Sequence, residues 1–182
     1  SSKRKRRPMY DFESQIIDIP DYPEPGVIFK DITPLFANAE ALKAMVDAFA
    51  DHYRNKGITK VIGPEARGFM VGAPVAAALG AGFVPARKPG KLPRETMSVS
   101  YELEYGTDTL EIHKDAICSK DTVLILDDLI ATGGTAEATG KLVQDMGAKL
   151  VGYGCILELA FLNPRERLES SDAEFFSLVE VN

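Results

Sequence analysis

Cysteine is scarce in this chain, which has only Cys118 and Cys155 among its 182 residues. The two lack the spacing of metal ligands, and so small a number favours a reducing compartment. Long apolar runs are missing as well. The most apolar stretch, residues 68–84, is rich in Gly and Ala and contains Pro74, which predicts a buried helix followed by a strand rather than a membrane span. With no apparent signal peptide, we expect a cytoplasmic protein without a membrane partner.

Positive charge is in short supply beyond the first few residues. The formal net charge is −6 and residues 3–7 alone carry +5, so residues 9–182 carry −11. So acidic a body is a poor nucleic-acid binder, and we expect no nucleic-acid partner. Residues 1–9 are predicted to be a disordered basic tail or a remnant of cloning, although such a run could also be a localisation signal or a nucleic-acid arm. No low-complexity linker marks a second domain, so residues 10–182 are predicted to form a single one.

The clearest structural pattern lies at residues 123–147. Residues 123–126 are Val, Leu, Ile and Leu, which is typical of a parallel strand buried on both faces. Asp127 and Asp128 follow, where this strand should emerge from the sheet. A turn of small residues at 131–135 then leads into a helical pattern from Ala136 to Met146, which Gly147 ends.

A second unit of the same plan precedes it. A strand at residues 60–63 is predicted to run through residues 64–68 into a helix at 69–79, and residues 82–87 form another strand. The order strand–helix–strand predicts an α/β fold with a parallel sheet. Elsewhere the patterns predict helices at 10–17, 39–56 and 163–168, an irregular Pro-rich segment from 19 to 34, a mobile basic loop at 87–94, a hairpin of 98–105 with 109–112 turning at 106–108, and strands at 149–159 and 175–181.

The turn at residues 131–135 has the chemistry of a phosphate site. Its backbone N–H groups and the positive end of the following helix suit a phosphate, and Gly133 and Gly134 permit close approach. Thr132 and Thr135 can add hydroxyl donors. The two acids before the turn are better suited to sugar hydroxyls or a metal ion than to the phosphate. No Gly-Lys-Ser/Thr sequence ends the turn, which excludes a Walker A loop. An ordinary strand–turn–helix without a ligand is the simpler alternative.

Residues 123–135 resemble the signature of type I phosphoribosyltransferases, which bind phosphoribosyl pyrophosphate (PRPP). Four further motifs, in order, make the chain similar over residues 10–181 to the adenine-specific members of that family: residues 25–32, 65–69, 87–93 and 103–106. The resemblance implies a mostly parallel central sheet flanked by helices, a small N-terminal hood at about 18–36 over the base site and a flexible hairpin loop at about 88–108. It also implies transfer of the phosphoribosyl group from PRPP to adenine, giving AMP and pyrophosphate in purine salvage, with Mg²⁺, by a homodimer.

By resemblance, the hood residues recognise the base. Phe29 would stack on adenine, while the backbone of Ile28 and Lys30 would read its edge. Val27 and Leu129 complete the predicted base pocket. Lys30 stands where many relatives carry Arg, a change that a backbone contact should tolerate.

The resemblance also assigns the reacting groups. Asp127 and Asp128 would hold the ribose hydroxyls and Mg²⁺, directly or through water, and Glu104 would accept the proton that adenine loses. The 5′-phosphate would bind residues Ala131, Thr132, Gly133, Gly134 and Thr135. The pyrophosphate would bind Arg67, Arg87, Lys88 and Lys91, beside a Glu65–Ala66 peptide expected to be cis, with Tyr105 on the closing loop.

Two other functions remain open from the sequence. The same signature fits phosphoribosyltransferases for hypoxanthine, guanine or xanthine. It also fits a PRPP-sensing regulator without catalysis, although such a protein needs a DNA-binding module and only the first residues are basic.

Overall fold

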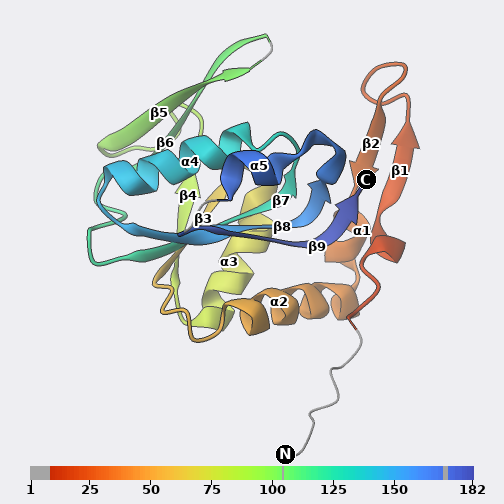
Figure 1. Cartoon of the computed structure of the whole chain (residues 1–182), viewed down its shortest axis with the longest axis horizontal. Helices are drawn as coiled ribbons and strands as arrows, with labels where there is room; N and C mark the ends of the chain where they lie inside the picture. Colours follow the sequence, from red (N-terminus) through yellow and green to blue (C-terminus); the bar gives the residue numbers. More distant parts are fainter. Residues whose placement is uncertain (1–8, 104, 170–171) are drawn as a thin grey trace, which may run out of the picture.

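Five parallel strands form the central sheet of the protein (Figure 1). The computed structural model describes residues 9–103, 105–169 and 172–182. The strand order is β4-β3-β7-β8-β9. These strands are β3 (Lys60–Pro64), β4 (Gly82–Ala86), β7 (Thr122–Ile130), β8 (Lys149–Leu159) and β9 (Glu174–Val181). The predicted α/β class and parallel sheet are confirmed.

Helices cover both faces of this sheet (Figure 1). One face carries α2 (Ala39–Tyr53) and α3 (Arg67–Leu79), and the other carries α4 (Gly134–Asp145) and α5 (Pro164–Leu168). No helix among the described residues is long and apolar enough to cross a membrane.

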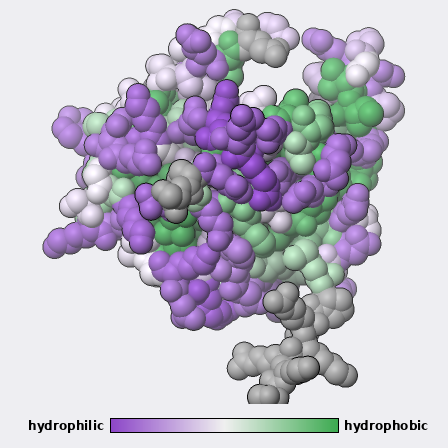
Figure 2. All heavy atoms as spheres, viewed as in Figure 1, coloured by the Kyte–Doolittle hydropathy of each residue, from purple (hydrophilic) through white to green (hydrophobic). Residues whose placement is uncertain are grey.

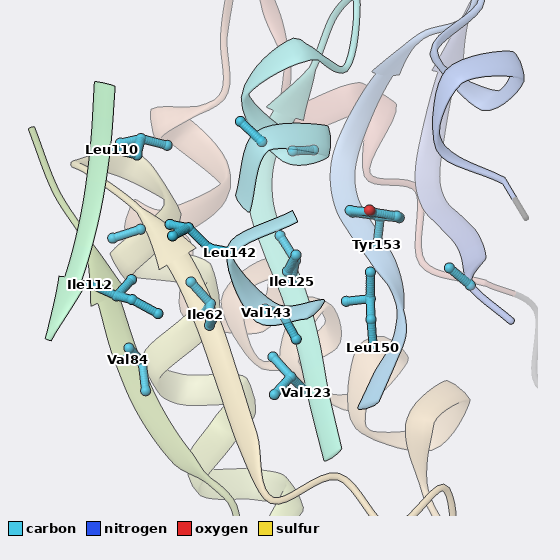
Figure 3. Packing of buried hydrophobic residues seen from close by; sticks show 14 of the residues in the cluster. Ile62, Val84, Leu110, Ile112, Val123, Ile125, Leu142, Val143, Leu150 and Tyr153 are labelled. Carbon is cyan, nitrogen blue, oxygen red and sulfur yellow. The ribbon is translucent and has the colours of Figure 1, made fainter. Parts of the chain in front are cut away.

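Alternation along β7 explains why the core has two parts. Leu124 and Leu126 pack in the cluster that holds α2 and α3, whereas Val123 and Ile125 pack in the cluster that holds α4. Figure 3 shows the second cluster, in which Val123 and Ile125 lie beneath the helix that carries Leu142. Side chains of successive strand residues point to opposite faces, so a strand with helices on both sides must be apolar at every position.

Two hairpins stand away from the sheet at opposite ends of the molecule (Figure 1). Near the N-terminus, the single-turn η1 (Glu13–Gln15) is followed by β1 (Ile17–Pro20), its antiparallel partner β2 (Ile28–Asp31) and the short helix α1 (Thr33–Ala37). The other hairpin pairs β5 (Thr96–Leu103) with β6 (Gly106–His113). A short 3-10 turn, η2 (Ala160–Leu162), leads from β8 to α5.

Three sequence-based expectations about these elements were wrong. Asp127 and Asp128 lie inside β7, because that strand continues to Ile130 rather than ending at residue 126. The β5–β6 hairpin turns before Gly106, since Leu103 already pairs with Gly106, so the predicted turn at 106–108 belongs to β6. The helix expected at residues 10–17 is only the three-residue η1, and β1 begins at Ile17.

The Pro-rich segment is more regular than predicted. Pro20 ends β1, while Pro23 and Pro25 lie in the connecting loop, where Gly26 has a φ of 86° and donates its N–H to Asp21 Oδ1. The prolines therefore occupy positions that need no ladder hydrogen bond, and β2 remains free to pair. The predicted tail at residues 1–9 lies outside the described part of the chain except for Met9.

Candidate active site

The site lies where the chain reverses direction across the sheet. From β3 the chain passes to β4 on one side, whereas β7 lies on the other side of β3 and continues to β8. Ligands of open parallel sheets bind at such switch points, beyond the carboxyl ends of the strands. Residues 65–66 follow β3 at this edge, and the turn at residues 131–133 follows β7.

Two neighbouring cavities open at this edge. The larger one, of about 650 Å³, is lined by Glu102, Leu103, Tyr105, Asp127, Leu129, Ile130, Ala131, Thr132, Gly133, Gly134, Thr135, Ala136 and Arg167. The smaller one, of about 210 Å³, is lined by Pro64, Glu65, Arg67, Lys88, Tyr101, Leu103, Asp108, Leu110, Asp127, Asp128, Leu129 and Thr135. They share Leu103, Asp127, Leu129 and Thr135. A ligand with two separate anionic ends could therefore fill both, with its middle at Asp127.

The turn before α4 has the form expected of an anion site. Gly133 precedes the helix in the left-handed conformation, with a φ of 89°, and α4 begins at Gly134. The first N–H groups of a helix have no partner within it and carry its positive end. Thr132 is exposed and can donate its hydroxyl to a ligand. Thr135 instead donates its hydroxyl to the Tyr101 hydroxyl, at 3.2 Å.

The two acids of β7 differ in their surroundings. Asp128 is 3 % exposed, and Arg67 Nε lies 2.9 Å from its Oδ2. That approach is poorly aligned, so Oδ2 has no hydrogen-bond partner among the described residues. Asp127 accepts the backbone N–H of Asp128 at 2.8 Å. Burial, together with the neighbouring Asp128 carboxyl, raises the pKa of Asp127 well above its usual range.

This pair of carboxylates fits a Mg²⁺ ion that is shared with a substrate. No group of three His, Cys, Asp or Glu side chains suited to a metal occurs in the described part of the chain. Mg²⁺ commonly takes only one or two protein carboxylates and completes its shell with substrate phosphates and water. Asp127 lines both cavities and Asp128 lines the smaller one, where its Oδ2 is paired with Arg67, so a cation held there would meet carboxylate oxygens of both residues.

The loop after β4 gathers the predicted cations around Glu65. Lys88 donates its N–H to Glu65 Oε1 at 2.7 Å, Lys91 Nζ lies 2.6 Å from Oε2, and Arg87 Nε lies 3.5 Å from Oε1. The hydrogen bond from Lys91 is the main reason why the pKa of Glu65 is lowered. The Glu65–Ala66 peptide is cis, as predicted. Of these cations, only Lys88 lines the smaller cavity.

The residues predicted to bind a base lie apart from the two cavities, except for Leu129, which lines both. Val27 and Ile28 are 43 % and 61 % exposed on the β1–β2 hairpin, where Figure 2 shows apolar side chains at the surface. Phe29 is partly buried and does not belong to either core cluster. The Arg67 guanidinium lies 5.9 Å from the centre of its ring, so Arg67 connects this hairpin to Asp128. Lys30 pairs with Asp18 at 2.6 Å.

Comparison with known proteins agrees with this geometry. Residues 31–182 match the phosphoribosyl transferase domain. The adenine phosphoribosyltransferase of Aeromonas salmonicida is 55% identical over 169 residues, which cover 93% of both chains. The chain belongs to the adenine phosphoribosyltransferase family. Crystal structures of members from Rhodothermus marinus and Saccharomyces cerevisiae are similar, with TM-scores of 0.88 and 0.86 at 48% and 41% identity. They match 93% and 92% of this chain, and 96% of each structure is covered.

The structure also brings residues to this adenine phosphoribosyltransferase site that the sequence did not single out. Tyr101 accepts from Thr135 and lies 3.3 Å from Asp108 Oδ2, and Asp108 pairs with Lys88. The alternation of the hairpin strand, which puts Tyr101 and Leu103 on one face, was the available signal. Arg167 lies in α5, and no motif in that part of the sequence indicated a role for it. Tyr105 is 96 % exposed and borders the larger cavity, while Glu104 lies outside the described residues.

Proposed function

We propose that this member of the family transfers the 5-phosphoribosyl group from PRPP to N9 of adenine, giving AMP and pyrophosphate with Mg²⁺, in purine salvage. The observation that carries the proposal is the meeting of two cavities at Asp127, one beside a phosphate-binding turn and the other beside a cationic loop. The relatives support it, since the yeast structure holds adenine and that of Trypanosoma brucei holds AMP, pyrophosphate and ribose-5-phosphate.

The 5′-phosphate binds residues 131–135 in this proposal. The free N–H groups at the start of α4 and the exposed hydroxyl of Thr132 supply its hydrogen bonds. Gly133 allows the turn to be this tight, because a residue with a side chain rarely adopts its φ of 89°. Fixing the phosphate also fixes the sugar, so binding energy is converted into orientation.

Asp127 and Asp128 act on the sugar in the middle of the site. Their oxygens accept hydrogen bonds from the two ribose hydroxyls and lie near the anomeric carbon, where positive charge develops as the bond to pyrophosphate breaks. When bound, Mg²⁺ neutralises negative charge on the departing pyrophosphate. The same two carboxylates would hold the ion, directly or through water.

In this proposal the pyrophosphate binds to four cations. Arg67 and Lys88 line the smaller cavity, and Arg87 and Lys91 belong to the loop after β4. Arg87 and Lys91 now pair with Glu65, and Lys88 pairs with Asp108, so for these three cations binding exchanges a carboxylate for phosphate oxygens. Arg87 Nε has no hydrogen-bond partner among the described residues and is the readiest to exchange. The loop at about 88–108 must then rearrange over the substrate.

The base stacks on Phe29 of strand β2 in the β1–β2 hairpin. The backbone of Ile28 and Lys30 accepts from the exocyclic amine of adenine and donates to a ring nitrogen. A 6-oxo purine would place its own acceptor against a carbonyl, which such a site rejects strongly. Val27 and Leu129 cover the ring. Glu104 accepts or shields the proton lost from N7, with Tyr105 beside it.

The reaction can be tested with the purified protein, PRPP, Mg²⁺ and adenine. AMP and pyrophosphate should form in equal amounts, and omission of Mg²⁺ should stop the reaction. Absence of both products under these conditions would contradict the proposal. The comparisons do not favour specificity for hypoxanthine, guanine or xanthine, or a PRPP-sensing regulator. A homodimer and a cytoplasmic location remain predictions.

A further inference from the structure

Arg167 reaches the phosphate-binding turn from outside the PRPP signature. Its Nη1 lies 3.2 Å from the position that a Cβ on Gly134 would occupy, and Thr132 Oγ1 lies 3.8 Å from the same point. The guanidinium therefore lies over the first residue of α4. Arg167 also lines the larger cavity together with the whole of the turn.

The larger cavity would otherwise contain no cation. Among the described residues that line it, Arg167 is the one basic side chain, whereas Glu102 and Asp127 are acidic. A phosphate monoester carries close to two negative charges at neutral pH. The N–H groups of a helix end supply only about half a charge. A cation beside the turn would therefore offset charge on the phosphate that the helix end leaves unbalanced.

Arg167 is available for such a ligand. Among the described residues it pairs with Glu137 in the first turn of α4, and the distance from Nε to Oε2 is 3.9 Å, too long for a hydrogen bond. Its side chain is 45% exposed, so a ligand in the cavity can reach the guanidinium. Arginine suits a phosphate because its planar fork can donate two parallel hydrogen bonds.

The helix that carries Arg167 is anchored on both sides of it. Leu168 is 3 % exposed, and its Cγ lies 3.2 Å from the Cβ position of Gly133. Arg165 donates from Nε and Nη2 to the carboxylate of Glu158, which is 1 % exposed, at 3.0 Å each. The position of Arg167 is thus set by the fold and not by a free loop.

We propose that Arg167 binds the 5′-phosphate of PRPP and of AMP, as the cation of a subsite otherwise built from backbone N–H and threonine hydroxyl groups. The proposal rests on the proposed function and adds a residue of α5 to it. The phosphate end is present in PRPP and AMP alike, so Arg167 contributes mainly to affinity, while the backbone of the turn orients the sugar. Loss of Arg167 should therefore raise the KM for PRPP more than it lowers kcat.

The test compares Arg167→Gln, Arg167→Lys and the parent protein by calorimetric titration with AMP and, separately, with pyrophosphate. Losing a charge-assisted hydrogen bond should weaken AMP binding roughly tenfold in the glutamine variant. Lysine should restore part of that loss, and pyrophosphate binding should stay within about twofold of the parent, a tolerance well below one charge-assisted bond. Lys120→Gln removes the same charge just before β7, at the opposite end of the sheet, and should leave both titrations unchanged.

Two outcomes would overturn the inference. One is AMP binding by Arg167→Gln equal to that of the parent, and the other is an equal loss for AMP and pyrophosphate, which would indicate a general change of charge or fold. Circular dichroism and melting of each variant show whether the fold is intact. Failure of the proposed function looks different, because the parent itself would then not form AMP from adenine and PRPP.

Discussion

The surroundings of Asp127 disfavour the ionised form of its carboxyl group. Burial and the adjacent Asp128 carboxyl raise the pKa of Asp127. The folded state therefore binds this proton more tightly than the unfolded chain does. The free energy of unfolding falls as pH rises from the ordinary carboxyl pKa through the raised one, and the loss persists at neutral pH. A bound cation would instead stabilise the ionised carboxylate and lower this pKa. Such surroundings therefore suit a residue that contacts Mg²⁺ or a developing positive charge.

Asp127→Asn should separate stability from activity. The amide oxygen can still accept the N–H of Asp128, while the unfavourable charge is removed, so stability at pH 7 should rise by about 1 kcal/mol. Turnover should fall at least about 100-fold, because the charge opposite the anomeric carbon is lost. Thermal melting and steady-state assays measure the two effects. Asp121→Asn, just before β7, is the matched control and should lose stability without losing activity, since Asp121 accepts bonds from Thr59 and Cys118. Unchanged turnover of Asp127→Asn would contradict the account.

Glu104 has a chemical role only by the family resemblance, as the acceptor of the proton that adenine loses. Glu104→Gln should depress kcat, since an amide cannot accept the N7 proton, and Glu104→Leu should depress it further, because the leucine also loses the polar contact. Thermal melting of both variants shows whether a loss of kcat comes from the reaction or from the fold. Glu95→Gln at the base of the same hairpin controls for the charge. Equal activity of the parent, Glu104→Gln and Glu104→Leu would show that Glu104 has no part in the mechanism.

At the scale of elements, the buried carboxylate of Glu158 holds α5 to the end of β8. Arg165 chelates it, Ser177 Oγ donates to Oε1 at 2.8 Å, and the guanidinium lies 4.7 Å from the centre of the Phe175 ring. An unpaired carboxylate at 1 % exposure is strongly unfavourable. The helix that brings Arg167 to the phosphate turn therefore depends on this pair.

Arg165→Met should lower the free energy of unfolding by about 3 kcal/mol, which corresponds to a fall of roughly 6–12 °C in melting temperature. Adding Glu158→Gln to that variant should recover part of the loss, because no charge then remains buried. Chemical denaturation of the single and double variants measures the coupling. Additive losses, with no recovery in the double variant, would show that the pair does not anchor α5.

The elements differ in how far the sequence could predict them. The strand–turn–helix of β7 and α4 was predictable, because a fully apolar strand and a glycine turn have few other interpretations. The extent of β7 was not, since Asp127 and Asp128 break an apolar pattern although their backbone continues the ladder. The ribbon of β1 and β2 was hidden by its prolines, which lie at its end and in its loop.

The parts of the site that consist of contiguous sequence motifs were predictable. Residues 131–135 and the two acids were found because they are contiguous. Arg167 and Tyr101 were missed, since they reach the turn only through the packing of α5 and the β5–β6 hairpin, and no local pattern records that packing. Residues far apart in sequence become neighbours at the sheet edge only in three dimensions.

For the whole molecule, the distribution of charge matters more than its total. Residues 9–182 carry −11, yet the loop after β4 concentrates Arg87, Lys88 and Lys91 around one carboxylate. The cationic loop and the phosphate turn lie on either side of the point where the cavities meet. An acidic protein can thus present local positive charge to a polyanionic substrate.

The central claim, that the site uses PRPP to convert adenine, is tested most directly by base specificity. The measurement is kcat/KM for adenine, hypoxanthine, guanine and xanthine at saturating PRPP and Mg²⁺. Hydrogen bonding by the backbone of Ile28 and Lys30 predicts that adenine is preferred by about 10⁴-fold over each 6-oxo purine. A value for hypoxanthine or guanine equal to that for adenine would contradict the account.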